Sequence, residues 1–348
     1  MLVTGGLGFI GSTFAKRAAS AGNKVVVLDL MTYAADPMSL AGQNGIEIVH
    51  RNISDTALVA MLLHKHDIDT VVNFAAESHV DRSISDPGNF METNILGVYS
   101  LLSASLGHFQ QLSAGHAQSF RFVQISTDEV FGSLGETGHF TEESPYDPRS
   151  PYSASKAAAD HLVSAWHHTY GLPTITTYCT NNFGPYQYPE KLIPNLVHRA
   201  LAGEVLPIYG DGTNVRDWIY VEDHVSGVMQ ALERGAPGSR YAFGGGNERS
   251  NLALAREICQ ILDEVAPRSD GAPYASQIEF VADRPGHDYR YAIDGARAES
   301  ELGYAPQHQF AEALKAADRV IVVETYVARG APDPEASARR IAQLVGSK

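Results

Sequence analysis

Two groups of polar residues in the first half of the chain could do chemistry together. Thr127, Asp128 and Glu129 directly follow a short apolar run, and Tyr152 and Lys156 come about twenty residues later. Tyr152 and Lys156 are four apart, so on a helix both side chains face the same side. A lysine ammonium beside a tyrosine stabilises the phenolate, which could accept the proton of an alcohol while hydride leaves the same carbon.

The two adjacent acids are the unusual part, because a simple alcohol dehydrogenase has no obvious need for them. Once a ketone forms at one carbon, the neighbouring C–H becomes acidic. One carboxylate could then remove that proton while a carboxylic acid protonates a hydroxyl leaving one carbon further on. Mutual repulsion and partial burial can keep one acid of such a pair protonated. The competing interpretation is that Asp128 and Glu129 are solvated charges or a helix start.

A glycine-rich turn near the N-terminus predicts a dinucleotide site. Gly5, Gly8 and Gly11 follow a first short strand and open a helix over 9–20. Glycines at this spacing permit close approach to a pyrophosphate, whose charge the helix N-terminus stabilises. Asp29 ends the next apolar run, where its carboxylate can bind both ribose hydroxyls and repel a 2′-phosphate. NAD is therefore favoured over NADP, with an ordinary turn and a helix-capping Asp29 as the alternative.

The order of apolar runs and helical stretches predicts the fold class. Apolar runs at 25–28, 46–49, 70–75 and 120–125 alternate with expected helices near 55–65, 88–107 and 151–170. Ser150 and Pro151 supply a cap and a first turn for the last helix. Strands without polar alternation indicate a parallel sheet covered on both faces. We expect an α/β, Rossmann-type doubly wound parallel sheet with a smaller, discontinuous α/β substrate-binding lobe.

The composition limits the classes of partner. A formal net charge of -14 and a pI of about 5.4 argue against nucleic acid and membranes as partners. Cys179 and Cys259 are the only cysteines, so neither a disulfide framework nor a metal site is expected. No apolar run approaches the length of a membrane span, and we expect a soluble, cytoplasmic protein.

Longer motifs point to a family. They share positions at expected strand ends and loops: AAESHVDRS at 75–83, STDEV at 126–130, YSASK at 152–156, NNFGP at 181–185, PEKLIP at 189–194, RDW at 216–218 and ADRPGHD at 282–288. With these motifs the chain, over roughly residues 1–310, resembles the nucleotide-sugar branch of the extended short-chain dehydrogenase/reductase family. Within that branch it resembles the dTDP-glucose 4,6-dehydratases. Related epimerases share the glycine-rich turn and the Tyr/Lys pair but lack the Asp–Glu pair.

The resemblance implies a reaction: dTDP-glucose becomes dTDP-4-keto-6-deoxyglucose, in deoxysugar biosynthesis, with NAD as the retained cofactor. Tyr152 would be the base at C4, Glu129 would remove and return the C5 proton, and Asp128 would protonate the departing C6 hydroxyl. Hydride then returns to C6. Thr127 would orient the C4 oxygen. Lys156 would hold the nicotinamide ribose and lower the pKa of Tyr152.

The expected binding residues follow from the glycine-rich turn, from Asp29 and from the resemblance. Those for the cofactor are Gly5, Gly8, Phe9, Ile10, Gly11, Asp29, Leu30, Met31, Thr32, Asn52, Ile53, Phe74, Ala75, Ala76, Ser78, Thr93, Tyr152, Lys156 and Asn182. Those for the nucleotide-sugar substrate are Ser78, Thr127, Asn181, Lys191, Leu192, Pro207, Ile208, Tyr209, Arg216, Asn251, Asp283, Arg284 and His287. Arg216 is the natural clamp for the diphosphate, because its planar fork matches phosphate oxygens.

After about residue 180 Pro, Gly, Tyr and Asn become frequent, which predicts a domain division, and the comparison with the family pattern shows a few departures. We assign 1–181 and 217–245 to the NAD-binding Rossmann domain, and 182–216 and 246–348 to the nucleotide-sugar-binding domain. Leu30, Ala35 and Asn52 stand where the family commonly has Lys, Gly and Asp. All these departures lie near the expected adenosine pocket, and none touches the expected chemistry.

Other functions remain open on the sequence alone. One is a dehydratase or epimerase acting on another NDP-hexose such as a UDP-sugar, since thymine and uracil differ by one methyl group worth only about 1 kcal/mol. Another is a non-catalytic, NAD-binding regulatory protein, against which the retained Thr127, Asp128, Glu129, Tyr152 and Lys156 argue. We expect a homodimer, because relatives pair the equivalents of the helices near 88–107 and 151–170 into a four-helix interface.

Overall fold

The computed structural model describes residues 1–314 of the chain. Its largest feature is a seven-stranded sheet in the order β10-β6-β5-β4-β1-β2-β3, with every neighbouring pair parallel. The strands are β1 (Leu2–Thr4), β2 (Val25–Asp29), β3 (Ile46–His50), β4 (Thr70–Asn73), β5 (Arg121–Ile125), β6 (Thr174–Cys179) and β10 (Arg240–Phe243). Strands β1, β2 and β3 form one half of the sheet in chain order. The chain then returns to the other side of β1, where β4, β5, β6 and β10 form the second half. This is the doubly wound, Rossmann-type order, so the predicted fold class is confirmed.

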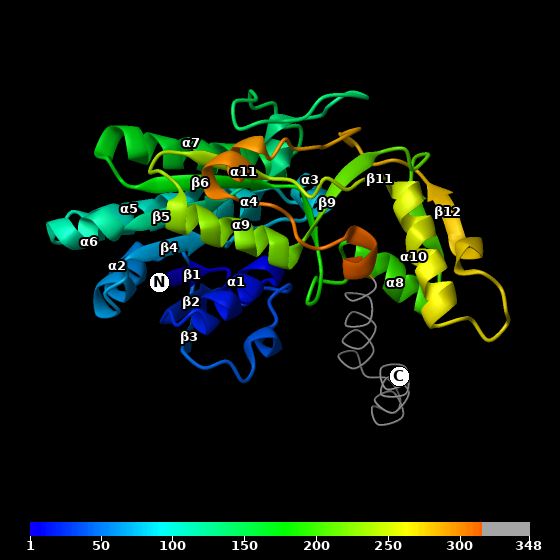
Figure 1. Ribbon diagram of the computed structural model, residues 1–348, viewed down its shortest axis with the longest axis horizontal. Helices are drawn as coiled ribbons and strands as arrows, with labels where there is room; N and C mark the ends of the chain where they lie inside the picture. The colour runs from blue at the N-terminus through cyan, green and yellow to red at the C-terminus, as the bar shows by residue number, and fades with distance from the viewer. Residues whose placement is uncertain (315–348) are drawn as a thin grey trace.

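Helices cover both faces of this sheet (Figure 1). One face carries α1 (Phe9–Ser20), α9 (Val221–Arg234) and α11 (Ala296–Leu302), and the other carries α2 (Thr56–Lys65), α5 (Val98–Phe109) and α7 (Pro151–Tyr170). Successive strand residues point to opposite faces, so Val3 packs with Phe14 of α1 while Leu2 packs with Leu63 of α2. Fully burying each such side chain stabilises the fold by about 1.5–3 kcal/mol.

The sheet also carries a row of buried polar side chains near its carboxyl edge. The Thr4 hydroxyl donates to Asn73 Oδ1 at 2.5 Å, and Asn73 Nδ2 donates to Gln124 Oε1 at 2.8 Å. These bonds link β1, β4 and β5 side by side. A buried polar atom that loses its hydrogen-bond partner costs free energy. These bonds therefore hold the ends of the three strands in place relative to one another.

A smaller lobe forms at the carboxyl end of the sheet (right in Figure 1). It contains the three-stranded sheet β11-β9-β7 and the two-stranded sheet β12-β8. Its elements are β7 (Asn181–Phe183), α8 (Leu192–Ala202), β8 (Leu206–Tyr209), β9 (Val215–Tyr220), β11 (Glu248–Ser250), α10 (Asn251–Val265), η4 (Tyr274–Gln277) and β12 (Ile278–Val281). A separate core includes Phe183, Leu196, Trp218, Ile258 and Leu262, so the predicted smaller, discontinuous lobe is present.

The helix predicted near 88–107 has an interruption. It consists of α4 (Gly88–Met91), a π-helical segment η2 (Glu92–Gly97) and α5, so the chain makes one wider turn in the middle. Such turns are uncommon and often occur at functional sites. The remaining short helices are α3 (Val80–Ser85), α6 (Ala114–Ser119), η1 (Pro37–Leu40) and η3 (Asp128–Phe131).

Several boundaries differ from those expected. The strand predicted at 70–75 ends at Asn73, and β6 was not predicted because its three threonines make a fully buried strand look polar. Helix α11 packs with α9 and β10 on the large sheet, although 246–348 was assigned to the second domain. The division as a whole stays a prediction, and 315–348 lies outside the described residues. No described helix is long and apolar enough to cross a membrane.

Candidate active site

A cavity of about 330 Å³ lies at the carboxyl edge of the large sheet. Its walls come from the segments that follow β1, β2, β4, β5 and β6. In an open parallel sheet, this is the edge at which ligands bind, beside the point where the strand order reverses.

Most predicted site residues meet in this cavity. All five predicted catalytic residues line it, as do all predicted cofactor residues except Met31. Among the predicted substrate residues, Ser78, Thr127, Asn181 and Lys191 line it. The others lie beyond its walls: Leu192, Pro207, Ile208, Tyr209, Arg216, Asn251, Asp283, Arg284 and His287.

The glycine-rich turn has the shape that a dinucleotide requires. Gly5 has a φ of +65°, and a Cβ there would lie 2.6 Å from the backbone nitrogen of Ala75. A Cβ on Gly11 would collide with the carbonyl of Gly5. Gly8 begins α1 without any side-chain cap, so the first N–H groups of the helix are free to bind an anion such as a pyrophosphate.

Asp29 both braces this turn and lines the cavity. Its carboxylate accepts from the backbone N–H of Leu7 at 2.9 Å and from that of Met31 at 2.7 Å. Each carboxylate oxygen has a second lone pair, so ribose hydroxyls can still bind. Asp29 caps none of the described helices, so the alternative interpretation of this residue is wrong, and the residues fit NAD.

Helix α7 brings Tyr152 and Lys156 into the cavity from one side. Ser150 and Ser153 form a capping box that starts the helix at Pro151, as the sequence predicted. The Lys156 ammonium donates to the carbonyl of Ile125, the last residue of β5, at 2.6 Å. The helix is therefore tied to the strand from which the catalytic acids emerge.

The pKa of Tyr152 is the clearest departure from expectation. Burial raises it well above its ordinary value, the nearby Glu129 raises it further, and a hydrogen bond with Thr127 opposes both effects. The Lys156 ammonium is directed to a backbone carbonyl, and burial lowers its own pKa. The sequence predicted that Lys156 lowers the pKa of Tyr152. The polypeptide without its cofactor does not show this effect.

Asp128 is a buried acid with an unsatisfied oxygen. Only 2% of the residue is exposed, and its Oδ2 has no hydrogen-bond partner among the described residues. The Thr127 hydroxyl lies 3.3 Å from the other oxygen, Oδ1. Burial raises the pKa of Asp128 well above its ordinary value, Glu129 raises it further, and Arg216 opposes this. These conditions favour a protonated carboxyl group that can donate a proton.

Glu129 has a different electrostatic setting. Burial raises its pKa too, but the positive charges of Arg284, Arg216 and Lys191 all act to lower it. Two adjacent carboxyl groups therefore differ in their environment, which is how one fold keeps one acid protonated and its neighbour ionised.

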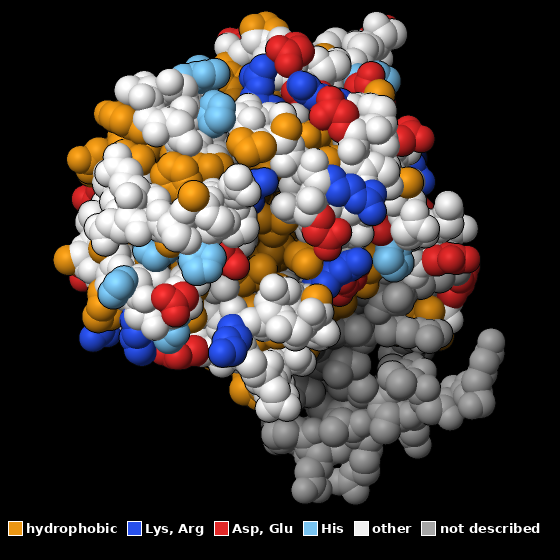
Figure 2. Space-filling view, turned by 60° about the vertical axis from the view of Figure 1, so that its left-hand side comes forward, with side chains coloured by type: hydrophobic (Ala, Val, Ile, Leu, Met, Phe, Trp, Pro, Cys, Tyr) orange, Lys and Arg blue, Asp and Glu red, His pale blue; other side chains and the backbone are white. Residues whose placement is uncertain are grey.

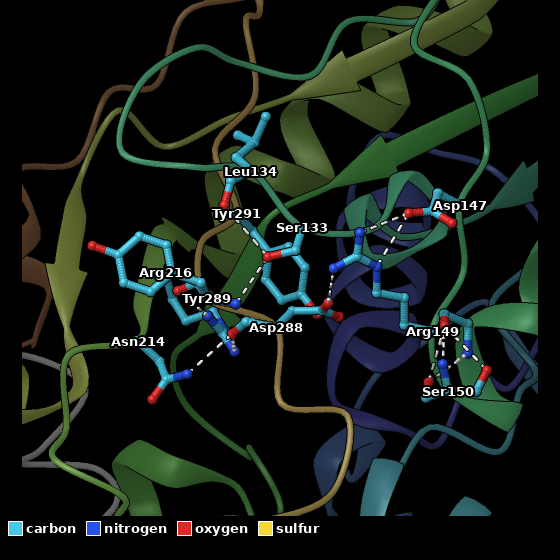
Figure 3. Close-up of polar contacts among 11 residues, drawn as sticks. Ser133, Leu134, Asp147, Arg149, Ser150, Asn214, Arg216, Asp288, Tyr289 and Tyr291 are labelled. Carbon is cyan, nitrogen blue, oxygen red and sulfur yellow. Dashed lines mark hydrogen bonds and ion pairs between the residues drawn. The ribbon is translucent and has the colours of Figure 1, made fainter.

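Arg216 belongs to β9 of the small lobe, and Figure 3 shows its side chain beside Asp288, Tyr289 and Tyr291. Its guanidinium donates to the carbonyls of Asp288, at 3.0 Å, and Tyr289, at 3.3 Å, and lies 4.3 Å from the centre of the Tyr291 ring. The side chain is buried and has no ion pair with any described carboxylate. A buried cation without a paired acid is a ready site for an anionic ligand.

The other distant substrate candidates fall into two kinds. His287 bonds to Asp283 at 2.6 Å and its ring lies 6.3 Å from that of Tyr209, so these three form one cluster. Asn251 keeps a buried, unbonded Oδ1, whereas the side chain of Ile208 belongs to the small-lobe core. Ile208 can thus offer a ligand only its backbone.

Sequence reasoning missed several residues that shape this site. Asn94 lies on the π-helical turn. Its side chain accepts from the backbone N–H of Glu77 and donates to the carbonyl of Glu77, both at 2.9 Å, and it also donates to Ser155 at 2.8 Å. Asp160 is buried behind Lys156 and accepts from the Ser126 hydroxyl at 2.5 Å. The spacing of Lys156 and Asp160, one turn apart on a predicted helix, was the available signal for Asp160. Asn94 offered none.

Comparison with known proteins agrees with this geometry. Residues 2–317 match the family described as GDP-mannose 4,6 dehydratase. A dTDP-glucose 4,6-dehydratase of Xanthomonas campestris pv. campestris (strain B100) is 53% identical over 316 residues, 90% of each chain. The chain belongs to the dTDP-glucose 4,6-dehydratase family.

Solved structures place this family in its wider context. The dTDP-glucose 4,6-dehydratase from Streptomyces venezuelae, solved with NAD bound, has a TM-score of 0.83 and 43% identity, covering 94% of this chain and 97% of that one. A UDP-glucose 4-epimerase of Thermus thermophilus, in complex with NAD, has a TM-score of 0.80 at 27% identity, covering 92% of this chain and 98% of that one. Dehydratases and epimerases thus share one scaffold, and the family resemblance noted in the sequence is confirmed.

The raised pKa of Asp128 predicts a pH-dependent cost in stability. Because the folded-state pKa lies above the unfolded one, stability from this group is present below the ordinary value of 3.8 and is lost as the pH rises through the raised value. We expect the free energy of unfolding of Asp128→Asn to increase relative to that of the parent as the pH rises from 3.8 through the raised pKa of Asp128. Urea unfolding at several pH values measures this. A Glu136→Gln control on the exposed surface should show no such trend, and a pH-independent Asp128→Asn difference would contradict the argument.

Proposed function

We propose that this chain is an NAD-dependent dTDP-glucose 4,6-dehydratase, a hydro-lyase that makes dTDP-4-keto-6-deoxyglucose. The observation that carries the proposal is the buried, unbonded carboxyl group of Asp128, which lies beside Glu129 in the cavity that also contains Tyr152. Simple oxidation or epimerisation has no use for this acid. The names of relatives with about half of their residues identical to this chain point to the same reaction.

NAD is the proposed cofactor, and the glycine-rich turn, Asp29 and Lys156 would hold it. Bound NAD supplies an acceptor and then a donor of hydride, and its positive charge would favour the phenolate of Tyr152 that burial disfavours. The Tyr152 phenolate would take the proton of the C4 alcohol of the sugar and become the neutral hydroxyl. The Thr127 hydroxyl, which lines the same cavity as Tyr152, would orient the C4 oxygen.

The acid pair would carry out the loss of water. With a ketone at C4, the C5 proton is acidic enough for the Glu129 carboxylate, whose ionised form Arg284, Arg216 and Lys191 favour. Asp128, held protonated by burial, would donate to the departing C6 hydroxyl. When hydride reaches C6, Glu129 returns its proton to C5.

The small lobe would bind the nucleotide diphosphate. Arg216 is the proposed clamp, because its charge is buried and unpaired while its fork fits two phosphate oxygens. Asn251, with a buried unbonded oxygen, and the cluster of Asp283, His287 and Tyr209 complete the proposed substrate surface.

One incubation tests the proposal. Purified protein with dTDP-glucose, and no added stoichiometric NAD, should yield a 4-keto product with its characteristic absorbance in alkali. UDP-glucose and UDP-galactose serve as parallel substrates for the alternative of a UDP-sugar dehydratase or epimerase. Protein that retains NAD but turns over no hexose nucleotide would instead support a regulatory role.

The first chemical step can be tested at Tyr152. Tyr152→Phe removes only the hydroxyl and should slow product formation by roughly 10²–10⁴-fold, as expected for a lost general base. Retention of NAD by the variant, measured after gel filtration, separates a chemical defect from a binding defect. Product formation within a few-fold of the parent would show that another group takes the C4 proton.

The dehydration step can be tested at Asp128. Asp128→Asn keeps the shape of the side chain but removes the acidic proton, so water loss should slow while C4 oxidation is partly retained. Reduced cofactor should then accumulate after mixing with dTDP-glucose, as a rise in absorbance near 340 nm in stopped flow. If hydride transfer disappears in a normally folded variant, the division of labour between Asp128 and Tyr152 is wrong.

We also propose a homodimer formed through α5 and α7. Tyr99 and Tyr170 are 49% and 51% exposed, and the ring of Trp166 lies between them at 5.9 Å and 5.5 Å from theirs. Figure 2, with the α5 and α7 end turned forward, shows patches of hydrophobic side chains. Light scattering at micromolar concentration should give twice the monomer mass, and Tyr99→Asp should lower it, whereas a monomeric parent would refute the dimer. A cytoplasmic location stays a prediction.

A further inference from the structure

Three side chains from separate segments form a clasp beside the cofactor cavity: Tyr33 from the loop after β2, Arg82 from α3, and Glu190 from the loop before α8. The Tyr33 hydroxyl donates to Glu190 Oε1 at 2.8 Å. Arg82 Nη2 lies 3.2 Å from the other oxygen, Oε2. A single carboxylate therefore joins a loop of the large lobe, a helix of the large lobe and a loop of the small lobe.

Ring contacts close the clasp. The guanidinium of Arg82 lies 3.7 Å from the centre of the Tyr33 ring, a cation–π arrangement. The Tyr33 ring also meets Tyr188 edge-on, with centres 5.3 Å apart. His79 Nε2 lies 3.7 Å from Glu190 Oε2. Each member of the clasp thus contacts at least one of the others, so the loops separate only if several contacts break together.

The clasp lies at the wall of the cavity. Thr32 and Ala34, the neighbours of Tyr33, line the cavity, and so do Tyr188 and Glu190. One residue further on, Lys191 Nζ donates to the carbonyl of Ser78 at 2.9 Å, which ties the same small-lobe loop to the segment that follows β4.

We propose that Tyr33, Arg82 and Glu190 retain NAD in the cavity, and that their release sets how fast the cofactor leaves. This inference rests on the proposed function. A 4,6-dehydratase takes a hydride from C4 and returns it to C6 of the same sugar, so cofactor lost between the two steps strands the oxidised sugar. Arg82 remains half-exposed, so its ion pair with Glu190 is partly screened by solvent, and local closure is the principal effect that we assign to it.

The experiment measures cofactor release without substrate. Parent, Tyr33→Phe and Glu190→Gln are loaded with radiolabelled NAD, chased with excess unlabelled NAD, and sampled by rapid gel filtration. Tyr33→Phe loses one hydrogen bond to a charged group, and Glu190→Gln loses the charge shared with Arg82, so release should accelerate roughly tenfold in each. Glu136→Gln, which removes one charge at an exposed position away from the clasp, is the matched control and should release label at the parental rate.

A turnover readout adds a second measurement. In dTDP-glucose the two clasp variants should lose activity over successive cycles and regain it with added NAD, while the parent needs none. Parental release rates in both variants would overturn the clasp, even if the parent converts dTDP-glucose. Accelerated release with no turnover by the parent would support the clasp and count against the proposed reaction. A parent that, once stripped of bound nucleotide, binds no label would overturn both.

Discussion

The contact between α7 and the carboxyl end of β5 is the constraint on which the rest of the site depends. Lys156 bonds to the carbonyl of Ile125, and one helical turn later Asp160 accepts from the hydroxyl of Ser126. Both bonds are buried, where unsatisfied partners would be costly, so the helix has little freedom to slide. The segment that begins at Thr127 is thereby held beside Tyr152, and oxidation and dehydration share one cavity.

Burial shifts the pKa values of the catalytic residues, which helps one step of the reaction and hinders another. It raises the pKa of Asp128 and of Tyr152, which suits a proton donor but opposes a base. Burial raises the pKa of Glu129 as well, but positive groups from other segments, Arg284 and Arg216, oppose this effect. The polypeptide thus prepares the acid for dehydration, whereas the base for oxidation needs the charge of the cofactor. This difference links the two half-reactions to the same bound dinucleotide.

Much of the architecture could be predicted from local sequence. Helices α1 and α7 begin and end where expected, because Gly8, Ser150 and Pro151 are local signals for helix starts. The strand at 174–179 was missed, since its threonines are polar in type yet buried in place. The π-helical turn at 92–97 was also missed, because the contacts that define Asn94 come from Glu77 and Ser155, far away in the chain.

The sequence by itself determined the reaction class, since Thr127, Asp128, Glu129, Tyr152 and Lys156 lie in two short motifs whose spacing has a local meaning. The tertiary structure decided their protonation and their surroundings. A pKa depends on burial and on charges brought from other segments, as when Arg216 approaches Glu129 across the lobes. The same holds for the clasp, in which Tyr33 and Glu190 lie 157 positions apart in the chain and meet only because the two lobes fold against each other.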